Sequence, residues 1–152
     1  MPKPKKKRTK KYRPREPGFP AICDFNGRKL ISEKIADDLE LSMRMQLKAF
    51  RESPTIFAWS FVVGVLLICD RLSYDVEEGE ELRKEFTTAY RRMDDAWKVW
   101  VLHNEVAHGN LDYVESIVPI IFEFVQQFSG HEIVQAREYV SNHNAKPIGY
   151  EA

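Results

Sequence analysis

An uncharged, strongly apolar stretch between Glu52 and Asp70 constrains the fold of this chain more than any other feature. Large apolar side chains recur so often from Ile56 to Cys69 that a helix built from this stretch has no polar face. A helix that is apolar on every side is buried, either in a protein core or in a bilayer. The uncharged run is short for a bilayer, which usually needs about 20 residues. We therefore expect a central helix over Ser53 to Tyr74 in a helical domain, with no membrane span.

Four further segments carry apolar residues at every third or fourth position, the period of an amphipathic helix. These segments are Ser32 to about Phe50, Glu80 to His108, Asn110 to Ser129, and Glu132 to about Ser141. Ser32 and Ser53 are placed to act as N-caps, with Pro54 at the first helical position. Pro119 lies inside a continuous apolar period, which predicts a kink instead of a chain reversal. The expected fold is all-α, a compact bundle of about five helices packed mostly antiparallel.

The first twenty residues differ sharply in composition from the rest of the chain. They contain five prolines and nine Lys or Arg against one Glu, and they cannot bury apolar area, which predicts a disordered basic tail. Residues 21–152 are then a single helical domain, and Asn26-Gly27 within 21–31 favours a small β-hairpin. The net charge is +8 over residues 1–20 and −8 over residues 21–152, which sum to zero. A basic segment on an acidic body is typical of proteins that bind a polyanion.

The basic tail is the most specific candidate binding site in the sequence. Cations there can neutralise phosphates while the tyrosine ring stacks on a base. The candidate nucleic-acid-binding residues are Lys5, Lys6, Lys7, Arg8, Lys10, Lys11, Tyr12, Arg13 and Arg15. Such contacts predict non-specific binding of DNA or RNA. The same residues also fit a nuclear-localisation signal in a eukaryotic protein, or a solubilising extension.

The run KKKRTKKYRPR resembles the start of many small uncharacterised proteins encoded by phages and prophages of proteobacteria. In that group a Lys/Arg run ending in Tyr-Arg-Pro precedes a helical body, and the resemblance here covers Lys5 to Pro14. It implies a bacterial cytoplasmic protein with a small accessory role, on nucleic acid or against a host complex.

No catalytic constellation is evident in the sequence. His103 and His108 are five residues apart and so point away from a shared helical face, and the Glu105–His108 pair lacks the further carboxylates of a di-iron site. Cys69 lies among apolar residues that raise the pKa of a thiol and make it inert. Trp59, Trp97 and Trp100 lie on apolar stripes and are expected to fill the core. We expect a non-enzymatic protein without a cofactor or metal.

The long helix has more apolar surface than a simple seam requires. Its seam consists of Leu82, Phe86, Ala89, Met93, Ala96, Trp100, His103 and Ala107, and Gly109 and Asn110 follow as its end. A second set broadens this stripe, namely Tyr90, Trp97, Val99, Val101, Leu102 and Val106. Such a helix contacts two neighbours, and the surplus apolar surface would also let two copies associate as a homo-oligomer.

The function predicted from these features is that of a nucleic-acid-associated accessory protein whose tail contacts phosphates and whose acidic helical body engages a protein partner. The alternative is a phage-type inhibitor or adaptor of a host complex, in which the acidic body imitates nucleic acid. The expected location is the bacterial cytoplasm, or the nucleus if the source is eukaryotic.

Overall fold

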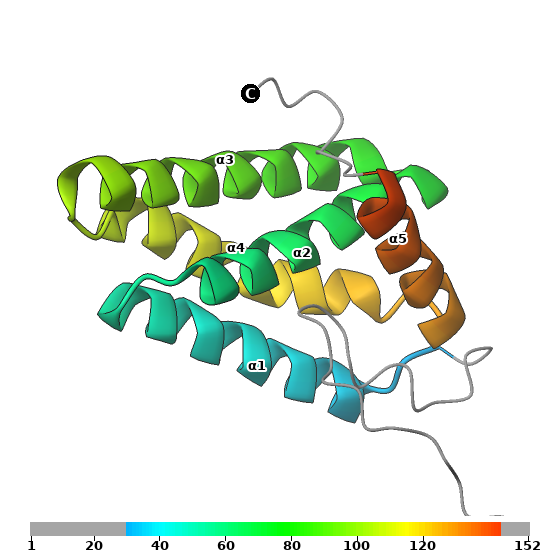
Figure 1. Cartoon of the computed structure of the whole chain (residues 1–152). Coiled ribbons are helices and arrows are strands. Elements are labelled where there is room, and N and C mark those ends of the chain that lie inside the picture. Colours follow the sequence, from blue (N-terminus) through cyan, green and yellow to red (C-terminus); the bar gives the residue numbers. More distant parts are fainter. Residues whose placement is uncertain (1–29, 144–152) are drawn as a thin grey trace, which may run out of the picture.

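The computed structural model describes residues 30–143, which form five α-helices and one 3₁₀ turn joined by short connections (Figure 1). The elements are α1 (Glu33–Glu52), α2 (Ile56–Leu72), η2 (Ser73–Asp75), α3 (Gly79–His103), α4 (His108–Val125) and α5 (Gly130–His143). The all-α fold class is thereby confirmed. The predicted basic tail and residues 21–29 of the predicted hairpin lie outside the described residues.

Helices α1 to α4 run alternately in opposite directions and form a four-helix bundle (Figure 1). Helix α1 packs against α2 and α4, and α3 packs against the same two neighbours from the other side. Helix α5 crosses one end of the bundle and packs against α2. There the guanidinium of Arg71 lies 4.3 Å from the ring centre of Tyr139.

Helix α2 is apolar on almost every side because it has three neighbours, α1, α3 and α5. The stretch Ile56–Asp75 is long and apolar enough by length and composition to cross a membrane, but most of it is buried inside the bundle. The expectation that no side faces water is wrong at its first turn, where Ile56 and Phe57 are each 56% exposed. Helix α5 packs near the other end of α2 and leaves this turn uncovered.

The predicted start of α2 is also wrong, by two residues. Thr55, not Ser53, is the N-cap, and its hydroxyl accepts a hydrogen bond from the Ala58 N–H at 3.2 Å. Ser53 instead ends α1, where its N–H bonds to the Ala49 carbonyl, so Pro54 lies in the connection. At the other end of α1 the predicted cap is confirmed, because Ser32 accepts from the Ile35 N–H at 3.2 Å.

The long helix α3 ends earlier than its apolar period predicts. It stops at His103 because Asn104 adopts the left-handed conformation (φ 54°), which asparagine tolerates better than most residues. Helix α4 then begins at His108 instead of Asn110 and ends at Val125, before the predicted Ser129. The prediction that α4 continues through Pro119 is confirmed.

The last helix is longer at both ends than predicted and begins with a capping box. The Ser129 hydroxyl accepts from the Glu132 N–H at 3.2 Å, and the Glu132 carboxylate accepts from the Ser129 N–H at 3.0 Å. This reciprocal pair satisfies two donors at the helix start. The sequence Ser-Gly-His-Glu at 129–132 carries the signal, so α5 begins at Gly130, not Glu132.

Aromatic side chains fill the core at both ends of the bundle. Phe86 of α3 lies 5.4 Å from Phe124 of α4 between ring centres, and Phe124 lies 5.0 Å from Phe128. Near the opposite end, Trp97 lies 6.4 Å from both Phe50 and Trp59 and so joins α1, α2 and α3. The indole N–H of Trp59 donates to the Met93 carbonyl at 2.9 Å. Trp59 and Trp97 are partly buried and pack against the core, as expected, whereas Trp100, also expected to fill the core, is only partly buried and is not among the residues packed against it.

Candidate functional site

The candidate nucleic-acid-binding residues of the basic tail, Lys5 to Arg15, all lie outside the described residues. The structure shows which residues form the helical body that follows them, so the net charge of this body can be counted. Residues 30–143 contain eleven Lys or Arg and twenty Asp or Glu, which gives a net charge of −9 with histidine neutral. The net negative charge of the described helical body is therefore enough by itself to balance the +8 of the basic segment.

His103, Glu105 and His108 do not share a helix, because the chain leaves the helical conformation at Asn104. His103 is the last residue of α3 and is exposed, so its predicted place in the packing seam of the long helix is wrong. His108 is the first residue of α4, whereas the sequence pattern placed it at the end of the preceding helix. Over residues 30–143, no group of three or more His, Cys, Asp or Glu side chains is placed to hold a metal ion.

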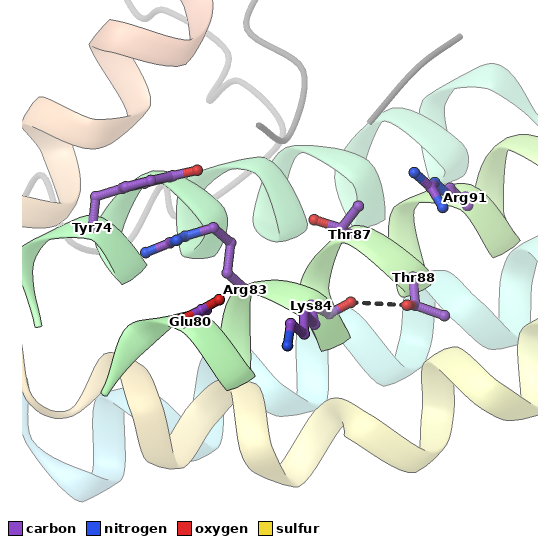
Figure 2. A pocket seen from close by; sticks show the side chains of 7 residues that line it. All are labelled: Tyr74, Glu80, Arg83, Lys84, Thr87, Thr88 and Arg91. Carbon is purple, nitrogen blue, oxygen red and sulfur yellow. Dashed lines mark hydrogen bonds between the residues drawn. The ribbon is translucent and has the colours of Figure 1, made fainter. Parts of the chain in front are cut away.

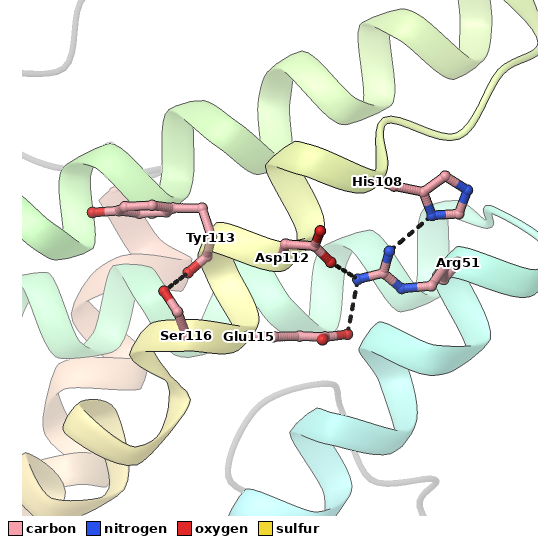
Figure 3. Close-up of polar contacts among 6 residues, drawn as sticks. All are labelled: Arg51, His108, Asp112, Tyr113, Glu115 and Ser116. Atoms are coloured by element: carbon pink, nitrogen blue, oxygen red, sulfur yellow. Dashed lines mark hydrogen bonds and ion pairs between the residues drawn. The ribbon is translucent and has the colours of Figure 1, made fainter.

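His108 belongs instead to a polar cluster centred on Arg51 at the end of α1 (Figure 3). One guanidinium nitrogen of Arg51 lies 2.8 Å from Nδ1 of His108, and the other donates to Asp112 at 2.9 Å and Glu115 at 3.1 Å. Burial alone would lower the pKa of Arg51, but hydrogen bonds and charges from Glu115 and Asp112 raise it. These contacts link the end of α1 to the first turns of α4, and His108 has a structural role in them.

Sequence reasoning did not find the Arg51 cluster, and no local pattern could have revealed it. Arg51 is separated from His108 by 57 positions and from Glu115 by 64. Only the packing of α1 beside α4 brings the guanidinium and its three partners together.

Cys69 is fully buried in α2, as its apolar neighbours predict. Burial raises the pKa of its thiol, and the neighbouring charge of Asp70 raises it further. Because the thiolate is the reactive form, this cysteine is not a nucleophile in the folded protein.

A Cys23→Ser variant tests the protection of Cys69. With Cys69 as the remaining thiol, we expect native protein at pH 8 to react with Ellman's reagent at least about a hundredfold more slowly than protein unfolded in urea. The measurement is the rise of absorbance at 412 nm with time. Equal rates in the two states would contradict the burial of this side chain.

Four large apolar residues are exposed at the end of the bundle where α2 begins and α3 ends (Figure 1). We call these the apolar end: Ile56 and Phe57, each 56% exposed, Val101, 61% exposed, and Leu102, 73% exposed. Val101 and Leu102 were expected to widen the packing stripe of the long helix, and their exposure corrects that expectation. Near this end, the ring of Trp97 already packs against Phe50 of α1 and Trp59 of α2. Ile56, Phe57, Val101 and Leu102 lie beyond these rings and remain at the surface.

Comparison of this chain with protein-family models, with curated proteins and with solved structures found no match.

Proposed function

We propose that this chain is a non-enzymatic, nucleic-acid-associated accessory protein. Its basic segment contacts phosphates through Lys5 to Arg15, and its acidic helical body engages a protein partner in a bacterial cytoplasm. The observation that carries the proposal is the segregation of charge, +8 over residues 1–20 against −9 over residues 30–143. Cations concentrated in this way bind phosphates, whereas an acidic surface repels nucleic acid and suits a protein partner.

The apolar end supports a protein partner for the body. Ile56, Phe57, Val101 and Leu102 are exposed at the end of the bundle where α2 begins and α3 ends. Large apolar side chains gathered on a surface are typical of protein–protein contacts. The partner can be another protein or a second copy of this chain.

The same observation favours a second candidate function, a protein-binding inhibitor or adaptor of phage type. In that case the acidic body itself does the work, by imitating nucleic acid in a basic groove of a host complex. The basic segment would then be incidental to activity.

Removal of residues 1–17 separates these two functions. We expect the intact chain to bind single-stranded oligonucleotides with an affinity that falls steeply with salt, the slope of log K against log[salt] reaching about −5 to −6 if all eight cations contact phosphates. The truncated chain should lose this affinity. Fluorescence anisotropy at 50 and 150 mM salt measures it.

A full-length variant with Gln at Lys5, Lys6, Lys7, Arg8, Lys10, Lys11, Arg13 and Arg15 is the matched control for chain length. It should behave as the truncated chain does. An intact chain that binds neither DNA nor RNA at 50 mM salt would overturn the nucleic-acid proposal and leave the inhibitor or adaptor.

A further inference from the structure

A hollow on the side of α3 carries the opposite charge to the rest of the described body. Its volume is about 390 Å³, and its lining includes Tyr74, Arg83, Lys84, Thr87, Thr88 and Arg91 (Figure 2). Glu80 is the one carboxylate among the lining residues, so three cations face one anion. The surrounding described chain has a net charge of −9, which makes this hollow a local positive site.

Arg83 is held in one position before any ligand arrives. Its Nε donates to the Ser73 hydroxyl at 3.1 Å and its Nη2 to the Ser73 carbonyl at 3.3 Å. Its guanidinium also lies 3.5 Å from the ring centre of Tyr74. Nη1 takes no part in these two bonds, so its two N–H groups have no partner in them among residues 30–143 and can donate to an anion. A donor that is already fixed loses little side-chain entropy on binding.

Lys84 and Arg91 are both exposed and extend the positive charge along the helix. Lys84 pairs with Glu81 at 3.7 Å, and because both side chains are largely exposed this pair is weak enough to yield to a ligand. The hydroxyl of Thr88 donates to the Lys84 carbonyl at 2.8 Å (Figure 2).

The length of the hollow indicates what kind of anion fits it. Arg83 and Arg91 are eight residues apart, or about 12 Å at a rise of about 1.5 Å per residue. One phosphate group is too small to meet cations at both ends, whereas a nucleic-acid strand carries one phosphate per nucleotide and can present several along this length. A partly exposed tyrosine ring next to a row of cations is typical of sites for single strands, whose unstacked bases reach aromatic rings.

We propose that this hollow binds the phosphodiester backbone of a single-stranded nucleic acid, with Arg83, Lys84 and Arg91 on its phosphates and Tyr74 beside a base. The proposal rests on the proposed association with nucleic acid and adds a second contact, on the helical body, to that of the basic segment. Partial burial raises the pKa of the Tyr74 phenol, against the opposing charge of Arg83, so the phenol stays neutral at pH 7.

The test is a titration of the ¹⁵N-labelled full chain with a ten-residue oligothymidylate, followed by amide NMR at 50 and 150 mM salt. We expect shift changes at residues 83–91 in addition to those at residues 5–15. A double variant, Lys84→Glu with Arg91→Glu, should lose the changes at 83–91 and keep those at 5–15. Its salt slope should be shallower by about 1.4, which is about 0.7 for each lost phosphate contact.

The matched control is Arg44→Glu with Lys48→Glu, which makes the same change of net charge on α1. Arg44 and Lys48 form exposed ion pairs with Glu40 and Glu52 within their own helix, outside the hollow. Equal losses in the two double variants would show an effect of net charge alone and overturn the proposal. Shift changes confined to residues 1–29 would overturn the proposed binding at the hollow but keep the proposed function. The absence of any shift change would overturn both proposals.

A phosphorylated peptide of the same charge as the oligonucleotide is titrated in parallel. Stronger binding of this peptide at residues 83–91 would assign the hollow to a phosphoprotein and overturn the nucleic-acid proposal. Circular dichroism spectra of both double variants should match that of the parent chain, because all four substituted side chains are exposed.

Discussion

Replacing Phe86 with alanine is expected to lower the free energy of unfolding by about 3–5 kcal/mol. Phe86 is fully buried between α3 and α4, where its ring contacts that of Phe124. The substitution removes a large apolar side chain and leaves a cavity that close-packed neighbours fill only in part. Domains of this size are stable by about 5–15 kcal/mol, so the loss is a large fraction of the total. Urea unfolding followed by circular dichroism at 222 nm measures it.

The control for Phe86 is the same substitution at the apolar end. Phe57 is 56% exposed in the first turn of α2, so Phe57→Ala should change the free energy of unfolding by less than about 1 kcal/mol. Similar losses at the two positions would contradict the burial of Phe86, or would show that Phe57 is covered in solution by a partner or a second copy.

Gly79→Ala is the second substitution with a large expected effect, a destabilisation of about 3 kcal/mol, at the upper end of the usual cost of overpacking. Gly79 begins α3, and a Cβ atom at this position would overlap the carbonyl oxygen of Ser73 and lie 2.8 Å from the Ser73 carbonyl carbon. Ser73 cannot easily give way, because it is fully buried and accepts two hydrogen bonds from Arg83. Thermal and urea unfolding of the variant measure the loss.

Gly64→Ala is the contrasting variant in the same chain. Gly64 lies within α2, and apart from its chain neighbours and the backbone of its own helix no described atom lies within 4 Å of the position that a Cβ would take. Alanine there should raise the free energy of unfolding by about 0.5–1 kcal/mol, because glycine is a poor helix former. If Gly79→Ala did not lower the free energy of unfolding either, this result would contradict the close contact between Gly79 and Ser73 of η2.

Local sequence patterns predict much of the fold. The apolar stretch after Glu52 and the periodic seam from Phe86 to Ala96 predict helices that must be buried, and the structure buries them. The Ser32 cap and the continuation through Pro119 were equally predictable, because capping and periodicity depend on residues within one or two turns of each other.

Helix ends were less predictable because adjacent elements compete for the same residues. Ser53 fits the N-cap of α2, yet its backbone N–H is taken by the last turn of α1, and Thr55 caps α2. An apolar period that runs on past His103 predicted a longer α3, but the left-handed conformation of Asn104 ends the helix. Pattern alone does not show which of two compatible local conformations is stabilised by the rest of the protein.

What the sequence determined by itself is the all-α class, the buried central helix and the separation of a basic segment from an acidic body. Only the tertiary structure decided that Arg51 meets His108, Asp112 and Glu115, and that Tyr74 and Ser73 hold Arg83 at the edge of a positive hollow. The physical reason is distance along the chain. Helix patterns arise from residues three or four positions apart, whereas these sites depend on how elements are oriented against one another, which the packing of the whole bundle decides.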